Sequence, residues 1–226
     1  MKVAVCLHAP AHADDTALVE GDAAALAQAV ALAGEGTAVT AVMPGTSREA
    51  APLRRALIAG ADRALRVAAD DLTGADLHTL GQVLSIALRR AGADLIVVGM
   101  RTDGDGLGAA GAVIARHLGA RFVPGVEEIV AGPGSTIEVA ARGGGLRRRL
   151  RVRLPAVLAV STGPATPPAA RVPAAGAPEI EVLSLSDPEA TVVRRRTELL
   201  GRHEPASRGV ATVSSAAELV AALARR

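Results

Sequence analysis

The chain has 226 residues, half of them hydrophobic, which is enough for one large domain with appended segments. Its 25 basic and 23 acidic residues leave a net charge of +2, too small to indicate nucleic-acid binding, and its one aromatic residue, Phe122, argues against base stacking on single strands. A single cysteine, Cys6, excludes a disulfide within the chain, and we find no signal-peptide pattern and no apolar run of roughly 18 residues. We therefore expect a soluble, cytoplasmic protein without stable membrane insertion.

Short β-branched runs alternate with longer helical patterns in the first half of the chain. Strands are predicted at residues 2–7, 37–43, 63–67 and 94–98, and helices at residues 22–33, 47–59, 76–90 and roughly 109–118. Asp22 is expected to cap the first helix, and Ser47 and Glu49 give the second helix a capped, acidic start. This order predicts an α/β fold, with a parallel sheet, right-handed crossovers and helices on both faces.

The pattern changes after about residue 121. The expected elements are antiparallel strands at residues 127–130, 136–140 and 146–154, a further strand at 155–160, a short strand at 179–185, a candidate basic helix at 187–200 and an amphipathic helix at 214–223. Between them, residues 161–178 are rich in Pro, Ala and Gly and predict an extended arm. The chain therefore divides into residues 1–160, with antiparallel strands after 121, and a C-terminal extension, residues 161–226.

Ligands of open α/β sheets bind at the carboxyl ends of the strands, where the strand order reverses. The loops after Leu7, Met43 and Met100 are therefore the candidate binding loops. The third loop is rich in glycine, and Gly106-x-Gly108-x-x-Gly111 has the spacing of dinucleotide-binding turns, in which backbone N–H groups contact phosphate. Two alternatives stay open: a plain strand-to-helix turn in an Ala/Gly-rich chain, and aspartates in the loop that bond the amides of the turn.

The sequence contains no recognisable catalytic set. Its five histidines are scattered without metal-binding spacing, and neither a Gly-x-Ser-x-Gly turn nor a Walker-type Gly-Lys-Ser/Thr motif is present. Cys6 has no activating neighbour in the sequence and is interpreted as a buried structural thiol. We expect no catalytic residues, no metal site and no enzymatic activity.

Several segments in order point to a known family. They are residues 1–6, residues 25–29, residues 54–64, residues 94–99 followed by Asp103-Gly104-Asp105, and residues 145–158, which hold the Leu-Pro-Ala-Val strand. Nearly end to end, the chain resembles the β subunits of electron-transfer flavoproteins (the FixA family). The Asp-Gly-Asp loop and the Leu-Pro-Ala-Val strand are the more specific pieces.

The resemblance implies a fold like that of the adenine nucleotide alpha hydrolases and a role as the small subunit of a heterodimer. In this family the α subunit holds a redox-active FAD, and the β subunit binds AMP or a second FAD while electrons pass from flavin-linked dehydrogenases to an acceptor. The matching cofactor contacts are Ala9, Asp22, Pro44, Thr102, Asp103, Gly104, Asp105, Gly106, Gly108 and Gly111. The matching dehydrogenase-docking residues are Arg171, Val172 and Pro173 in the arm.

The chain departs from the family pattern at several of these places. Val19-Glu20 replaces Asn-Pro before the first helix, and the Thr and Gln donors that follow Asp-Gly-Asp are absent. Each lost hydrogen bond corresponds to about 1 kcal/mol. Val172 replaces a leucine, and Arg147 or Arg148 replaces an acidic residue that pairs with the α subunit. The chain is therefore interpreted as a divergent member.

Residues 147–153 are strongly basic and alternate in their second half. As a strand they would place Arg149, Arg151 and Arg153 on one face and Leu150, Val152 and Leu154 on the other. This basic face is either a solvated surface or a contact for an acidic partner subunit or a flavin phosphate, with nucleic acid the least favoured reading.

The sequence leaves two alternative functions to consider. A universal-stress-like adenine-nucleotide-binding module without a flavin partner would be a homodimer that binds ATP, but it needs neither the antiparallel strands nor the arm. A nucleotide hydrolase of the related fold is disfavoured because the sequence lacks a nucleophile or Walker-type motif.

Overall fold

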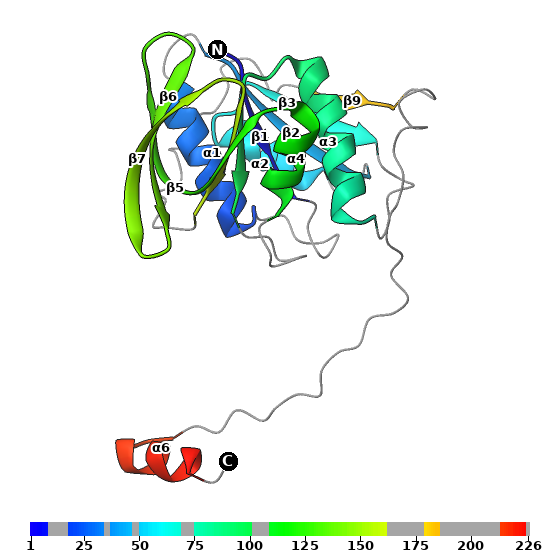
Figure 1. Ribbon diagram of the computed structural model, residues 1–226. Helices are drawn as coiled ribbons and strands as arrows, with labels where there is room; N and C mark the ends of the chain where they lie inside the picture. Colours follow the sequence, from blue (N-terminus) through cyan, green and yellow to red (C-terminus); the bar gives the residue numbers. More distant parts are fainter. Residues whose placement is uncertain are drawn as a thin grey trace.

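The computed structural model describes residues 1–8, 18–33, 37–46, 50–68, 75–100, 109–161, 179–185 and 213–224. Its strands are β1 (Val3–Cys6), β2 (Val39–Gly45), β3 (Arg63–Ala68), β4 (Leu95–Gly99), β5 (Arg121–Ala131), β6 (Thr136–Gly143), β7 (Leu146–Arg153), β8 (Ala156–Val160) and β9 (Ile180–Leu183). Its helices are α1 (Glu20–Ala33), α2 (Ala51–Ile58), α3 (Leu77–Ala91), α4 (Ala110–Leu118) and α6 (Ala216–Leu223). The strands form one nine-stranded sheet in the order β7-β6-β5-β8-β4-β1-β2-β3-β9 (Figure 1).

The centre of the sheet is parallel and fully buried. Val5 of β1 pairs with Ala41 of β2 on one side and with Val97 of β4 on the other. Every residue of β1, β4 and β8 is buried, as expected for parallel strands that are covered on both faces and are therefore apolar throughout.

Helices cover both faces of this sheet, which confirms the predicted architecture. On one face α1 and α2 pack into a core that includes Leu26 and Leu53. On the other face α3 and α4 pack into a second core that includes Leu88 and Ile114. The cores consist almost entirely of Ala, Val, Leu and Ile, so the small alanines of α1 lie close to the strands.

The antiparallel strands continue the sheet and bend away from it. The strand predicted at residues 127–130 is longer, because β5 starts at Arg121, pairs in parallel with β8 and then runs antiparallel to β6. Register shifts around Val126 mark the bend, where Gly125 has a φ of +69° and faces the carbonyl of Arg142 without room for a Cβ. We call the outer part of β5 with β6 and β7 the ribbon.

The ribbon curls over α1 (Figure 1). Its inner residues Ile129, Ile137 and Val152 belong to the same core as α1. The side-chain amide of Gln28 in α1 donates to the carbonyl of Glu127 at 3.0 Å and accepts the N–H of Ile129 at 3.3 Å. These two bonds fix the ribbon to the helix.

The beginnings of two helices differ from the prediction. Helix α1 begins at Glu20, so Asp22 lies inside its first turn, and its carboxylate accepts the backbone N–H of His8, which follows β1, instead of capping the helix. Helix α2 begins at Ala51 and has no side-chain cap at Ala50, because Pro52 in its first turn supplies a preformed φ. The predicted capping residues, 47 and 49, lie outside the described residues.

The C-terminal extension is described in two pieces. Strand β9 is present as predicted, pairs in parallel with β3, and is tied to it by the guanidinium of Arg63, which donates to the carboxylate of Glu181 at 2.7 and 3.0 Å. Helix α6 is present as predicted, capped by Ser215, which accepts the N–H of Glu218 at 3.2 Å. The predicted arm and the candidate helix at 187–200 lie outside the described residues.

Candidate functional site

The strand order reverses between β1 and β4. From β1 the chain passes through α1 to β2 on one side, whereas β3 leads through α3 to β4 on the other side of β1. Because α1 and α3 lie on opposite faces of the sheet, the carboxyl ends of β1 and β4 are the place at which open α/β sheets bind their ligands, and we call this place the crevice. The loops that the sequence singles out after Leu7 and Met100 leave the sheet at this crevice.

Two glycines bring the first turn of α1 against the end of β4. A Cβ on Gly99 would lie 2.8 Å from the carbonyl carbon of Gly21 and 3.1 Å from the carboxylate oxygen Oδ1 of Asp22. Only a residue without a side chain therefore fits at the end of β4. This close approach places Asp22 at the crevice.

Asp22 is buried and bonded to His8, the residue that follows Leu7 after β1. Its side chain is 1% exposed and the side chain of His8 is 27% exposed. One carboxylate oxygen accepts the backbone N–H of His8 at 2.7 Å, and the other lies 2.8 Å from the ring atom Nδ1. This pair joins the end of β1 to the first turn of α1.

Cys6 lies one residue before Leu7 at the end of β1 and is fully buried. Burial raises the pKa of its thiol to about 12, and the negative charge of Asp22 adds to this effect. The thiol is therefore protonated and unreactive at neutral pH. The predicted role as a buried structural thiol is confirmed.

Gly111, the third glycine of the dinucleotide-like pattern, is buried in the first turn of α4. A Cβ there would lie 2.8 Å from the Phe122 ring and 3.0 Å from Cγ2 of Val98. Its absence lets α4 pack against β4 and β5, which is also the packing role of the third glycine in dinucleotide-binding turns. Phe122 itself packs against the second core, so it contributes to packing rather than to a stacking surface.

The structure describes only part of the predicted cofactor site. Pro44 lies near the end of β2, paired with Val67, on the same edge of the sheet as Asp22. Ala9 and residues 102–108 lie outside the described residues, as do the docking residues Arg171, Val172 and Pro173, so these assignments stay predictions. His8 is one of the five histidines that show no metal-binding spacing in the sequence, and it lies at the crevice. Its position directly after a buried strand is the signal that points to the crevice.

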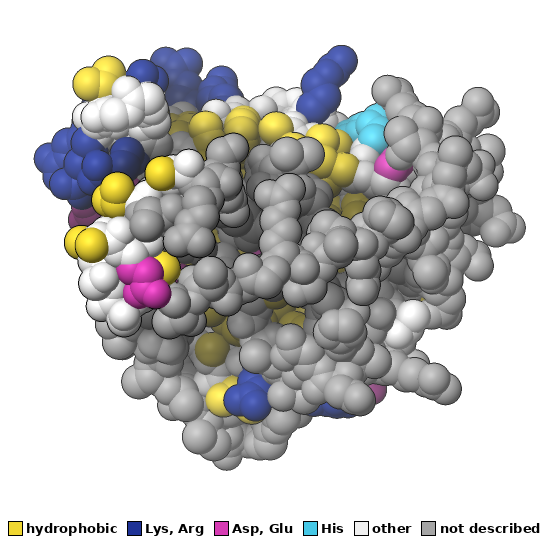
Figure 2. Space-filling model, turned by 90° about the horizontal axis from the view of Figure 1, so that it is seen from below, with side chains coloured by type: hydrophobic (Ala, Val, Ile, Leu, Met, Phe, Trp, Pro, Cys, Tyr) yellow, Lys and Arg dark blue, Asp and Glu magenta, His cyan; other side chains and the backbone are white. Residues whose placement is uncertain are grey.

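The ribbon carries the basic strand on its outer surface. Figure 2 shows Lys and Arg side chains gathered at the side of the molecule where the ribbon lies in Figure 1. Arg149, Arg151 and Arg153 are exposed, whereas Val152 is buried, as the alternation predicts. Leu150 departs from it because β7 is the edge strand, which leaves its side chain 38% exposed.

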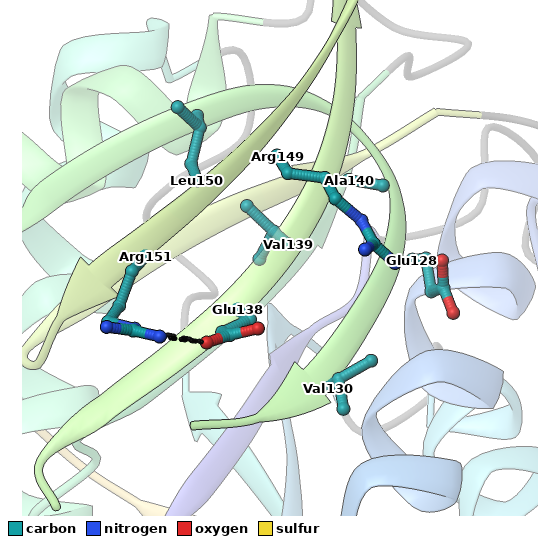
Figure 3. A pocket seen from close by; sticks show the side chains of 8 residues that line it. All are labelled: Glu128, Val130, Glu138, Val139, Ala140, Arg149, Leu150 and Arg151. Carbon is teal, nitrogen blue, oxygen red and sulfur yellow. Dashed lines mark hydrogen bonds and ion pairs between the residues drawn. The ribbon is translucent and has the colours of Figure 1, made fainter. Parts of the chain in front are cut away.

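A hollow of about 320 Å³ lies on this ribbon, away from the crevice (Figure 3). The small side chain of Ala140 lies between β5 and β7 there, and Arg149 reaches over it toward Glu128. Arg151 donates to Glu138 at 2.7 Å on the same surface. The hollow is open, and its lining side chains from three strands are exposed except for those of Val139 and Ala140, so it is a surface feature of the ribbon.

Some of the ribbon arginines are neutralised within the chain. Glu127 accepts from Arg142 at 2.6 Å and from Arg147 at 3.0 Å, and the bond from Arg142 lowers the pKa of Glu127 most. In the described part of the chain no carboxylate pairs with Arg148, Arg149 or Arg153. The outer surface of the ribbon therefore keeps a positive charge.

Metal-ligating clusters and membrane-spanning helices are both absent from the described residues. Across the described ranges, no three His, Cys, Asp or Glu side chains lie close enough together to hold a metal ion. His78 and His117 form a ring pair with centroids 4.8 Å apart. None of the helices described has the length and apolar composition needed to cross a membrane.

The pattern of one protein family, described as the electron transfer flavoprotein domain, matches residues 7–188. This chain belongs to that family. The match runs from the end of β1 past β9 and so includes both the crevice and the ribbon. The resemblance inferred from the sequence motifs is confirmed at this level.

Individual members of the electron transfer flavoprotein family show how far the likeness extends. The chain is 29% identical over 154 residues to the electron transfer flavoprotein subunit beta of Methylophilus methylotrophus, which covers 66% of this chain and 58% of that protein. It is 31% identical over 154 residues to the corresponding subunit of Mycobacterium tuberculosis (strain H37Rv), covering 66% of this chain and 57% of that protein. The matched region thus spans less than two thirds of the length of these relatives.

Proposed function

We propose that this chain is the β-type subunit of a heterodimeric electron transfer flavoprotein. The observation that carries the proposal is the family match over residues 7–188, which extends over the parallel sheet and the ribbon together. The subunit itself breaks and forms no bonds. It holds a nucleotide and supports the FAD of an α-type subunit, through which electrons pass from a dehydrogenase to an acceptor.

The nucleotide of this subunit is AMP or a second FAD, bound at the crevice between β1 and β4. Support comes from the reversal of strand order at this point and from the close approach of α1 to Gly99. Asp22 and Pro44 lie on the same edge of the sheet. The remaining proposed contacts, in the adjoining loops and at the start of α4, are Ala9, Thr102, Asp103, Gly104, Asp105, Gly106, Gly108 and Gly111.

The α-type subunit contacts the C-terminal extension, residues 161–226, and a flavin-linked dehydrogenase docks at Arg171, Val172 and Pro173. The ribbon supports a second contact with an acidic surface, because Arg148, Arg149 and Arg153 have no carboxylate partner among the described residues. Arg147 forms an ion pair with Glu127 of its own chain, at the place where relatives are expected to present an acidic residue to the α subunit. This supports an interface with the α-type subunit that differs from the interface in those relatives. The cytoplasm is the proposed location.

Co-expression with an α-type subunit encoded by the same organism tests this proposal. The expected product is a yellow complex with one copy of each chain, measured by light scattering after gel filtration and by flavin absorbance. A colourless chain that does not associate would contradict it. A homodimer that retains ATP would instead favour the universal-stress-like alternative.

A further inference from the structure

Strand β7 forms one edge of the sheet, and its outer side has unpaired backbone groups. It is the last strand in the sheet order, and its eight residues run in unbroken register beside β6 on one side only (Figure 1). It contains neither a proline nor a bulge, which are two of the devices that close sheet edges to other chains. Among the described residues, no backbone hydrogen bond joins β7 to any element other than β6.

The turn between β6 and β7 determines which residues of β7 direct their backbone groups outward. The turn consists of two glycines, residues 144–145, with φ of +58° and +76°, and in such turns the flanking residues exchange both hydrogen bonds. From the flanking pair, Gly143 and Leu146, bonded pairs recur at every second residue. The N–H of Leu154 donates to the carbonyl of Ser135 at 3.0 Å, which is in the same phase.

The residues whose backbone N–H and C=O groups face the free edge are all arginines. They are Arg147, Arg149, Arg151 and Arg153. The first and third of them pair with Glu127 and Glu138 of the same chain, whereas the second and fourth have no ion pair in the described part of the chain. Two copies of β7 placed edge to edge would bring these like charges opposite one another, which disfavours a second copy of this chain as the occupant.

Two leucines are exposed on the same strand. Leu146 is 60% exposed and Leu150 is 38% exposed. Both lie on the face of the ribbon that bears Val152, opposite the face that bears Arg149, because side chains alternate along a strand. Charge alone is enough to keep other strands away from an edge, so a purely protective role for the arginines leaves the exposed leucines unexplained. A strand paired with β7 would cover them.

We propose that β7 is a docking edge for an extended acidic segment of another protein, which adds one strand to the sheet in antiparallel orientation. Residues that exchange hydrogen bonds across such a pair have their side chains on the same face. If the first residue of the segment lies opposite Arg153, its fifth lies opposite Arg149, so acidic residues at these positions meet the two unpaired guanidinium groups. The fourth residue lies opposite Leu150 and is apolar.

This mode of recognition combines main-chain hydrogen bonds, which give affinity, with alternate side-chain contacts, which give specificity. It goes beyond the proposed function, which names an acidic surface as a partner of the ribbon but no pairing of strands. It depends neither on a nucleotide in the crevice nor on the flavin of an α-type subunit, so the two can be tested separately.

The probe is a peptide of eight residues, the length of β7, with glutamate at its first and fifth positions, valine at its fourth and threonine elsewhere. It is titrated into the ¹⁵N-labelled full chain, and the exchange rates of the backbone amides are measured by NMR. The outward amides of Arg149 and Arg153 should exchange about tenfold more slowly when the peptide is in about tenfold excess over its dissociation constant. The amides of Leu150 and Val152 already bond to β6 and should not change.

Two N-methylated versions of the peptide separate strand pairing from charge. Methyl groups on the third and fifth amides remove donors that face β7, whereas methyl groups on the second and fourth leave those donors intact, and the net charge is the same. Only the second version should slow the exchange of the outward amides.

A charge reversal in the protein tests the predicted alignment. Arg149→Glu should lower the affinity for the unmethylated peptide by about tenfold at physiological salt. Arg148→Glu is the matched control, because this side chain is also unpaired among the described residues but lies on the other face, and it should lower the affinity by about twofold at most. If Arg149→Glu does not fold, the two methylated peptides decide on the parent chain alone.

Equal binding of the two methylated peptides, with unchanged exchange of the outward amides, would show a contact of charge alone and overturn the inference. Absence of binding by every peptide would overturn it too, and binding to phosphatidylglycerol vesicles in that case would assign the arginines to an anionic membrane surface. A yellow heterodimer whose β-type chain pairs with no peptide would leave the proposed function intact. Peptide pairing by a chain that forms no heterodimer would leave this inference intact.

Discussion

Gly99 at the end of β4 faces Gly21 in the first turn of α1 so closely that a Cβ on Gly99 would lie 2.8 Å from the carbonyl carbon of Gly21. The obstructing atom belongs to backbone, so no flexible side chain can move aside. We predict that Gly99→Ala displaces α1, lowers the free energy of unfolding by about 1–3 kcal/mol and weakens nucleotide binding at the crevice.

Urea titration followed by circular dichroism measures this loss. Gly143→Ala is the matched control, because a Cβ on Gly143 meets nothing within 4 Å and its φ is not in the left-handed region. The control should unfold within about 0.5 kcal/mol of the parent. Equal stability of Gly99→Ala and the parent would contradict the close approach of α1 to β4.

Gly111 is predicted to be required for packing. In Gly111→Ala the new methyl group would meet the Phe122 ring at 2.8 Å and Val98 at 3.0 Å, and overpacking of this kind lowers stability by about 1–3 kcal/mol. A second substitution, Phe122→Leu, provides room and should restore part of the loss in the double variant. Thermal unfolding of the four proteins measures the coupling, and a strictly additive cycle would show that the ring and the methyl group do not meet.

Glu127 is predicted to link stability to pH. Arg142, followed by Arg147, lowers the pKa of Glu127 in the folded chain below its ordinary value of 4.5. A carboxylate with a depressed folded pKa stabilises the fold above its unfolded pKa, and this contribution is lost as the pH falls through the folded pKa. Glu127→Gln should therefore reduce stability at pH 7 and flatten the decline below about pH 4.5.

Unfolding midpoints between pH 3 and pH 7, roughly the range in which carboxylates titrate, provide this measurement. Glu128→Gln is the control, since the Glu128 carboxylate has no ion pair in the described part of the chain. Parallel pH profiles for Glu127→Gln and the parent would rule out a stabilising role for the pairs with Arg142 and Arg147.

Cys6 is predicted to be unreactive while the chain is folded. Burial raises its pKa to about 12, so the thiolate is scarce at pH 8, and the sulfur is inaccessible. Ellman's reagent should leave the native chain unmodified over hours and react fully once urea unfolds it. Rapid reaction under native conditions would show that the end of β1 is open to solvent.

The order and type of the elements follow from hydrophobic periodicity. Strands such as β1 and β4 are continuous apolar runs, so they can be predicted without knowing which strands they pair with. Helix α3 can be predicted because Asp76 caps its start and Gly92 marks its end. The length of β5 could not be predicted in this way. Its first residues pair with β8, which comes later in the chain, and its bend depends on the approach of Gly125 to Arg142.

The pair of residues at the candidate site could not be predicted from the sequence either. Asp22 looks like a capping residue because it stands near the start of a helical pattern. Its actual partner, His8, is 14 residues away, and the two meet only because β4 ends in a glycine that admits the first turn of α1. Contacts of this kind arise from packing between elements, so a linear pattern predicts the crevice but not the pair within it.

The nucleotides released from the co-expressed complex test the central claim most directly. The complex is denatured, and the supernatant is analysed by chromatography and mass spectrometry against the measured concentration of each chain. A β-type subunit that holds its own nucleotide predicts one FAD and one AMP per heterodimer, or two FAD. One FAD and no second nucleotide would contradict a nucleotide in the crevice between β1 and β4.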